Sequence, residues 1–417
     1  MASSSSATLP VLHEDLSDEV AMVDYENTLF SSSIKPGKPA ERSEYAEVAD
    51  KPQRGRLGGK SESRTVTRAD VTDRFTKRKK IKGIVQEKVE DYGVTDRAKE
   101  VENPAGIKDV AAEAYLRTVE SFKQGLELTG LSQQVQNDGM TVMNEKGAME
   151  AQHLTQGASA WCDAVPIGDS DLLVDALYRP AAAQNVLISS ALTEFDEAAL
   201  RAMLQAKRVA NNGPVDSLVF CTFDFQTHVD GFFDEKAVAS GRAHIRSFNY
   251  DGGASMFEVG LRGYKTTFGK MALNPTGHLN ATRELGAVDA NGEPRALTGT
   301  TVNGDATITV NSVRGLQPYM RIKGTGIPAG AYIIEIVDAT HIEISANATA
   351  DGSSIALTLG RLDHALFLEM QYFQKKTNGG IKDVDLTPEG SGQQGFVQGF
   401  FSYFCGLPSV QGKVHQN

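Results

Sequence analysis

The chain has 417 residues, of which 40% are hydrophobic, and it carries 40 glycines and a single tryptophan. No run of residues approaches the ~18–20 apolar positions that a membrane-spanning helix needs, so we expect no membrane partner. The length and the mean hydropathy of -0.29 predict a loop-rich protein of two or three domains. The N-terminus lacks the basic and apolar segments of a signal peptide, which predicts an origin in the cytoplasm.

The net charge of -11 is unevenly distributed. Residues 51–82 contain 12 lysines and arginines against three acidic residues, or +9, so the rest of the chain sums to -20. Residues 1–50 alone sum to -7. Opposite charges attract across interfaces, so we predict that the basic segment docks on an identical neighbouring chain. A nucleic-acid-binding arm and a solvated charged loop remain the alternatives. The predicted inter-subunit contacts are Arg54, Arg56, Lys60, Arg64, Arg68, Lys77, Arg78 and Lys79.

The first 103 residues favour extended structure. Residues 1–35 are rich in serine and acidic side chains and cannot bury much surface by themselves, which predicts an arm. Residues 36–103 combine glycine, proline and charge, and residues 65–68 and 81–89 alternate apolar and polar side chains as strands do. These patterns predict a hairpin-like loop with a basic tip. An isolated two-stranded ribbon is barely stable in water, so this loop needs a partner.

A long helix is predicted after the breaker at residues 103–106. Apolar side chains recur at spacings of three and four from Ile107 to Leu126 and form one stripe, and Gly130 is a plausible end. A second helix is predicted from an N-cap at Thr193, with Asp196 and Glu197 in its first turn. Its expected apolar face comprises Phe195, Ala199, Met203, Ala206 and Val209, with Leu200 and Leu204 alongside.

The second helix is expected to end at Asn211 and Asn212, and residues 217–222 are typical of a buried strand. Residues 297–360 contain five strand candidates separated by glycine-rich turns, at residues 307–311, 319–323, 332–337, 341–345 and 355–359. This spacing predicts a small inserted β-sandwich or barrel. Two long aromatic strands are predicted after it, at residues 366–373 and 395–404.

Catalytic and metal-binding motifs are missing from the sequence. The three cysteines form no CxxC pair, which predicts buried free thiols, and no two histidines are spaced i, i+4. We therefore predict no enzyme activity, no metal and no cofactor. Asp224 and His228 could form an acid–base pair on one helix face, although a surface salt bridge or a cap is favoured. The aromatic residues at 400–404 could stack on bases, although a strand packed in the core is favoured.

The order of these parts resembles one viral architecture. A helix precedes the turn Gly213, Pro214, Val215 and Asp216, a buried strand follows, and a strand with the sequence Tyr-Lys-Thr-Thr-Phe-Gly begins at Tyr264. This order is similar to that of the Hong Kong 97-like major capsid proteins of tailed bacteriophages, over residues 36–275 and 361–410. The resemblance implies an α+β fold of the Hong Kong 97 type with a small all-β insertion.

The resemblance also implies a division of the chain. Residues 1–35 would be the N-terminal arm, 36–103 the extended loop over an adjacent subunit, and 104–155 the peripheral domain with its spine helix. Residues 156–296 would form the axial domain around the capsomer centre, where the polar loop at residues 234–255 would meet its symmetry mates. Residues 297–360 would form the inserted domain, and residues 361–417 the C-terminal strands that complete the core.

The implied function is that of a structural subunit. Copies of the chain would assemble into hexamers and pentamers of an icosahedral head around double-stranded DNA, which the inner face would contact without sequence specificity. Minor capsid or decoration proteins, a portal and a scaffold are possible further partners, and the location would be the virion after assembly in the host cytoplasm. No lysine–asparagine crosslink is predicted, because no partner for Lys60 or Lys77 can be placed. The alternatives are a nucleic-acid-binding protein that uses residues 51–82 and a hydrolase with an appended β module.

Overall fold

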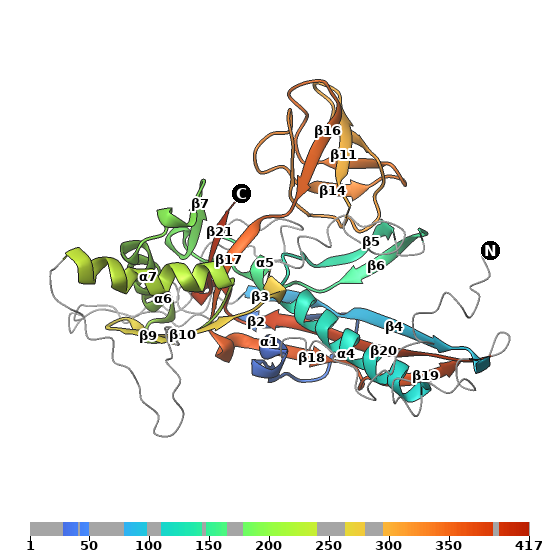
Figure 1. Cartoon of the computed structure of the whole chain (residues 1–417), viewed down its shortest axis with the longest axis horizontal. Coiled ribbons are helices and arrows are strands. Elements are labelled where there is room, and N and C mark those ends of the chain that lie inside the picture. The colour runs from blue at the N-terminus through green and yellow to red at the C-terminus, as the bar shows by residue number, and fades with distance from the viewer. Residues whose placement is uncertain are drawn as a thin grey trace, which may run out of the picture.

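The protein has an α+β fold in which one long helix, two large sheets and a small barrel are set side by side (Figure 1). The computed structural model describes residues 28–40, 42–49, 79–97, 110–143, 147–164, 178–239, 263–279, 295–386 and 392–416. Within these ranges, no helix has both the length and the apolar composition needed to cross a membrane.

The first sheet is built around one long strand, β20 (Gln393–Cys405). Strand β4 (Gln86–Val94) pairs with one edge of β20, and strands β18 (Phe373–Thr377) and β19 (Lys382–Leu386) follow each other along the opposite edge. The two-residue strand β1 (Lys35–Pro36) adds to β18 in parallel. The predicted strand at residues 395–404 is therefore confirmed as the centre of this sheet.

Helix α4 (Val110–Leu131) lies along one face of the first sheet (Figure 1). The predicted helix and its apolar stripe are confirmed from Val110 onward, and Phe122 and Leu126 are its buried anchors. The predicted start at Ile107 lies outside the described residues. The contact is close because β20 carries a glycine there. A Cβ atom on Gly399 would lie 2.8 Å from Phe122 Cζ.

The N-terminal segment corrects one expectation. The arm was predicted to be extended, but Leu29–Ser33 forms the short helix α1, and Phe30 is fully buried. Its ring packs edge-on against Phe220 and Phe373, and it also contacts Tyr403. Sequence patterning missed this helix because the burial of one aromatic ring depends on remote strands, not on local periodicity.

The second sheet has six strands in the order β7 (Asn185–Ile188), β21 (Gly412–Gln416), β17 (Leu362–Leu368), β8 (Val215–Cys221), β10 (Gly269–Pro275) and β9 (Gly263–Thr266). Strands β8 and β10 are parallel, as are β7 and β21, and the other pairs are antiparallel. Helices α6 (Glu197–Asn211) and α7 (Phe223–Ala239) pack against this sheet, and the short helix α5 (Ala158–Trp161) contacts both β17 and β20.

Helix α6 begins later than predicted. Asp196, not Thr193, is the N-cap, because its carboxylate accepts a hydrogen bond from Ala199 N at 2.7 Å, whereas Thr193 lies in a preceding 3-10 turn. The predicted apolar face is also rotated. The buried residues are Leu200, Met203, Leu204 and Lys207, and Val209 is 55% exposed. The predicted end is confirmed, since Asn212 adopts a left-handed φ of 55°.

The strand predicted at residues 366–373 is in fact two strands. Strand β17 ends at Leu368, a 3-10 turn occupies Met370–Tyr372, and β18 begins at Phe373 in the other sheet. The buried carboxylate of Glu369 lies at this corner and accepts hydrogen bonds from β8, which fixes the bend. An apolar run of this kind gives no local indication that it changes sheets.

The strands of residues 297–359 form a small barrel with its own apolar core. The strands are β11 (Leu297–Thr301), β12 (Thr307–Val310), β13 (Ile322–Lys323), β14 (Ile333–Ile336), β15 (His341–Ile344) and β16 (Gly352–Leu359). They pair in the order β13-β16-β11-β12-β15-β14. Hydrogen bonds from Ile322 N to Ala331 O and from Ile333 N to Met320 O join the two ends of this sheet, at 3.0 and 2.9 Å. All five predicted strands are present, whereas β11 was missed because its sequence is mostly threonine and glycine.

Two hairpins complete the described chain. Strand β2 (Glu44–Ala49) pairs with β3 (Lys79–Ile84), and β5 (Asn137–Met143) pairs with β6 (Met149–Leu154). Met143 at the end of β5 packs into the barrel core. The strand predicted at residues 81–89 is broken at Val85, because its two halves join different sheets. The other predicted strand of the loop, at residues 65–68, lies outside the described residues.

Candidate assembly interface

The predicted contact residues lie on the segment that joins β2 to β3. Arg54, Arg56, Lys60, Arg64, Arg68, Lys77 and Arg78 fall outside the described residues. The backbone of Lys79 begins β3 and pairs with Ala49 at the end of β2. The structure therefore gives the position at which the basic segment leaves and rejoins the fold.

The base of this two-stranded ribbon is fixed to the first sheet. Tyr45 of β2 bonds through its hydroxyl to Ser402 Oγ at 2.8 Å, and burial raises its pKa well above the usual range. The ammonium of Lys376 lies 4.5 Å from the centroid of the Tyr45 ring and forms an ion pair with Glu47. Gly83 on β3 leaves room for this ring, since a Cβ there would lie 2.4 Å from Tyr45 Cζ. The ribbon thus starts from a rigid support.

Strands β4 and β19 of the first sheet carry exposed acidic side chains, Glu87 and Asp91 on β4 and Asp383 and Asp385 on β19. The hydroxyl of Tyr92 donates to Asp383 Oδ1 at 3.2 Å and to Asp385 Oδ1 at 3.4 Å. Partial burial and the negative charge of Asp383 raise the pKa of Tyr92 to about 12, so it stays a neutral donor. Asp383 and Asp385 point to the same face of the sheet as Tyr92, whereas the pairing of β4 with β20 puts Glu87 and Asp91 on the opposite face. Asp383 and Asp385 form a surface, here called the acidic patch, that is complementary in charge to residues 51–82.

Helices α6 and α7 each expose an apolar side chain. Phe223 at the start of α7 is 56% exposed, and Val209 of α6 is similarly accessible. Single exposed apolar residues are common on monomers and do not by themselves mark a contact surface. The polar loop expected to meet symmetry mates, at residues 234–255, lies outside the described residues apart from the end of α7.

The candidate acid–base pair is not formed. His228 Nε2 lies 2.6 Å from the carbonyl oxygen of Phe195, and the ring stacks edge-on against Phe232. His228 is therefore held by the backbone and not by Asp224, so of the favoured alternatives, a surface salt bridge or a cap, the salt bridge is not formed. In the first turn of α7, Thr222 Oγ1 and not Asp224 accepts from Phe225 N. Asp224 occupies the first turn of α7, where a negative charge suits the helix dipole.

The thiols and the aromatic strand belong to the core. All three cysteines are free and buried, as predicted, and burial raises the pKa of Cys162 and Cys221 to about 12, which leaves them unreactive. Phe401, Tyr403 and Phe404 of β20 are buried, which excludes base stacking by these rings. In the part of the chain that the structure describes, no group of three or more metal-ligating side chains comes together.

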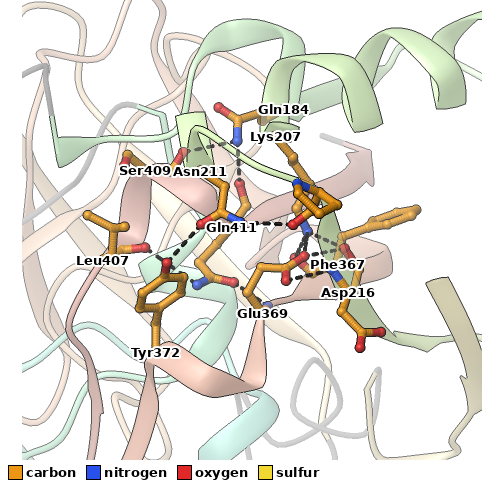
Figure 2. A network of polar contacts seen from close by, with 12 residues as sticks. Gln184, Lys207, Asn211, Asp216, Phe367, Glu369, Tyr372, Leu407, Ser409 and Gln411 are labelled. Atoms are coloured by element: carbon orange, nitrogen blue, oxygen red, sulfur yellow. Dashed lines mark hydrogen bonds and ion pairs between the residues drawn. The ribbon is translucent and has the colours of Figure 1, made fainter. Parts of the chain in front are cut away.

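A buried polar network, which the sequence did not indicate, joins the second sheet to its helix (Figure 2). Lys207 Nζ donates to Ser217 Oγ and to Phe367 O at 2.6 and 2.9 Å, and it lies 3.1 Å from Glu369 Oε1. Burial lowers the pKa of Lys207, while Glu369 opposes this effect. Glu369 N donates to Gln411 Oε1 at 2.8 Å, which extends the network to the C-terminal strand. In the sequence, Lys207 stands at a position of α6 where the helical period places a buried side chain. This signal of a buried ion pair was missed.

Comparison with known proteins gives a family. The family model described as SU10 major capsid protein matches residues 3–292, a range that ends just before β11. No curated protein matches the chain.

Three solved structures illustrate the structural likeness. A chain from Gordonia phage Cozz has 10% identity and a TM-score of 0.48, with 99% of this chain and 92% of that chain covered. A chain from the capsid of cyanophage P-SCSP1u has 10% identity and a TM-score of 0.45, with 97% and 93% covered. The capsid of the native GTA particle has 7% identity and a TM-score of 0.46, with 100% and 99% covered.

Proposed function

The chain belongs to the SU10 major capsid protein family and is a structural shell protein of a phage head, and we propose that it assembles as hexamers and pentamers. The head would be icosahedral and would enclose double-stranded DNA, with the Hong Kong 97-like arrangement of arm, extended loop, spine helix and axial domain. In this arrangement, α4 with the first sheet would form the peripheral domain. The second sheet with α6 and α7 would form the axial domain around the capsomer centre.

The proposed mechanism of assembly uses the charged loop. The ribbon β2–β3 is anchored through Tyr45 and carries between its strands nine basic residues, in the range 51–78. This asymmetry of charge is the observation that carries the proposal. We infer that Arg54, Arg56, Arg64 and Arg68 contact the acidic patch of an adjacent copy. Opposite charges steer and orient such contacts, and the repeated contact closes a shell.

The other surfaces have proposed roles in the same shell. The barrel Leu297–Leu359 would be an inserted domain that projects from the head and meets decoration proteins or neighbouring capsomers. Its separate core supports this role, because the two main sheets do not depend on it for their own apolar packing. A portal, a scaffold and minor capsid proteins are further proposed partners. The protein is a component of the virion, and we propose assembly in the cytoplasm of the host.

The docking proposal is tested by removing charge from the loop. In the full-length chain, Arg54, Arg56, Arg64 and Arg68 are all replaced by glutamine, and the matched control replaces the same four by lysine, which keeps the charge. We expect glutamine subunits to stay folded by circular dichroism but to form no shells in electron micrographs. The lysine control should assemble.

Two outcomes would contradict this account. Closed shells from the glutamine variant at normal yield would show that the four charges are not an assembly contact. A salt-dependent gel shift of double-stranded DNA that glutamine abolishes, with shell assembly intact, would assign the segment to nucleic acid instead.

A further inference from the structure

A cleft of about 180 Å³ lies where the barrel meets the body of the protein. One wall is the loop after α4, at residues 132–135, and the other is the barrel segment 317–321. The floor includes Asp163 and the link Leu359, Gly360 and Arg361, which leads from β16 into β17 (Figure 1). The volume far exceeds that of one water molecule, so the cleft can hold a small solute.

Two arginines line this cleft from opposite sides of the boundary. Arg321 comes from the barrel, and its Nη1 donates only to the carbonyl oxygen of Gly330, at 3.3 Å, among the described residues. Arg361 comes from the body, and its Nη1 lies 3.1 Å from Asp163 Oδ1. The Nε atom of Arg361 is buried and donates to no atom of the described chain. Both guanidinium groups thus keep donors that no described protein group satisfies.

The charges around the cleft do not cancel. Lys413 Nζ lies 2.8 Å from Asp163 Oδ1 and 3.9 Å from Asp363 Oδ1, so one lysine already occupies both carboxylates. With Arg361 and Arg321 added, three formal positive charges face two negative ones. Burial, followed by repulsion from Arg361, lowers the pKa of Arg321 to about 10, and the attraction of Asp163 only partly offsets this shift.

His415 does not supply a further charge at neutral pH. Burial and the neighbouring positive charges of Lys413 and Arg361 lower its pKa to about 2. Burial favours the protonated form of Asp163, but Lys413 and Arg361 outweigh this and hold its pKa below the usual range. The cleft therefore keeps one surplus positive charge at neutral pH.

The two arginines sit on a fixed frame. Gln133 holds the backbone of Arg361 on both sides, since its Oε1 accepts from Arg361 N at 2.9 Å and its Nε2 donates to Arg361 O. Gly360 N donates to Arg321 O at 2.8 Å, which ties the two arginine segments together. Tyr319 adopts a φ of 68°, a left-handed conformation that bulky residues rarely adopt and that clusters at binding sites.

We propose that this cleft binds an oxyanion of the phosphate class between Arg321 and Arg361, and that the bound ion ties the barrel to the body. A guanidinium group presents planar forks of N–H donors that match the oxygens of phosphate, and it holds its charge when partly buried. Two forks from different directions suit a tetrahedral ion with several oxygens better than a flat carboxylate. The surplus charge at the cleft supplies the electrostatic attraction.

The test measures the binding of inorganic phosphate to full-length subunits by isothermal titration calorimetry, in buffers matched for ionic strength with sodium chloride. The variants are Arg321→Gln, which has no ion-pair partner to lose, and Arg361→Lys, which keeps the charge beside Asp163 but removes Nε. Lys323→Gln is the matched control, because Lys323 is an exposed cation on the neighbouring barrel strand. We expect saturable binding that each arginine variant weakens at least ~10-fold, the order expected for the loss of one charge-assisted hydrogen bond.

Hydrogen exchange provides a second readout that does not depend on affinity alone. Phosphate should slow exchange of the amides at residues 317–321 and 359–361 in the parent chain and in Lys323→Gln, but not in Arg321→Gln. Acetate at the same ionic strength should have a much weaker effect. The proposal is wrong if phosphate binding is not saturable, if Arg321→Gln binds as tightly as Lys323→Gln, or if protection appears away from these segments.

Discussion

The body and the barrel bury their apolar residues in different ways. The body has one continuous core that runs from Phe30 to Val414 and joins both large sheets. The barrel core uses residues 297–359, with contributions from Met143 and Met149 of the β5–β6 hairpin. Buried charged side chains such as Lys207, Glu369 and Lys413 all lie in the body. In the barrel, whose residues 297–359 are all described, no charged side chain is buried.

The body and the barrel therefore reach a unique fold in different ways. The body brings together segments far apart in sequence, and its buried ion pairs select one register among several apolar alternatives. The barrel pairs only strands within residues 297–359, although β11 with β16, β12 with β15 and β13 with β16 are not consecutive in the chain. We therefore expect the body to be sensitive to single polar changes and the barrel to unfold separately.

The largest effect is expected from Glu369→Ala in the body. The change leaves Lys207 buried without a countercharge, which should destabilise the body by ~3–5 kcal/mol. The measurement is urea unfolding of full-length subunits followed by the fluorescence of Trp161, the single tryptophan, which is fully buried in the body core. The control is Lys270→Ala, which breaks the exposed pair Lys270–Asp216 and should cost ~0–1 kcal/mol. Equal effects of the two variants would contradict the role assigned to the buried network.

A comparable effect is expected from Phe30→Ala at the N-terminal segment. The ring is fully buried among three aromatic residues, so its loss should cost ~3–5 kcal/mol on the Trp161 transition. The neighbouring Leu29→Ala is the matched control, because Leu29 is 38% exposed. If both variants unfold like the parent chain, α1 does not belong to the body core.

A cavity in the barrel should have a local effect only. Ile342 is fully buried in the barrel, and Ile342→Ala should destabilise that domain by ~2–5 kcal/mol. Hydrogen exchange should accelerate throughout β12, β14 and β15, while the Trp161 transition stays where it is in the parent chain. A shift of the Trp161 midpoint by the same amount would show that the two cores unfold as one unit.

The body should also lose stability in mild acid because of His415. Its pKa is about 2 in the fold, whereas an unfolded histidine has a pKa near ~6.5. The unfolded state therefore binds the additional proton between these values, so stability falls as the pH drops below ~6.5. Between ~pH 7 and ~pH 5 the loss should be about 2 kcal/mol, and His415→Gln should reduce it. A pH profile unchanged by the substitution would refute this assignment.

The smallest effect on the body is expected from removing the barrel. We predict that a full-length chain in which residues 299–358 are replaced by a short glycine linker still folds and still forms shells. Electron microscopy of particles and Trp161 fluorescence measure the two parts of this prediction. Loss of the body transition would show that the barrel is part of the core and not an insertion.

The sequence predicted those elements whose residues follow a local period. Helix α4, strand β20 and five barrel strands were found because apolar side chains repeat at helical or strand spacing over their whole length. The three buried free thiols were predicted because the cysteines are far apart in the sequence and form no CxxC pair. These successes share one physical cause, because each depends on neighbours close in the chain.

The elements that were missed depend on remote partners. The division between β17 and β18 follows from Glu369, whose partners lie about 150 residues away, and the burial of Phe30 follows from Glu127, which accepts from Phe30 N at 2.6 Å. Lys207 is polar at a buried helical position, and only Glu369 explains it. The candidate interface was predicted from charge alone. Of its residues the structure describes only the Lys79 backbone, so the interface remains a prediction.

Negative-stain electron microscopy of the full-length chain, expressed alone and with its viral neighbours, tests the central claim most directly. The account predicts closed, uniform shells built of repeating capsomers under at least one of these conditions. A compact monomer under every condition, with no shells or capsomers, would contradict it.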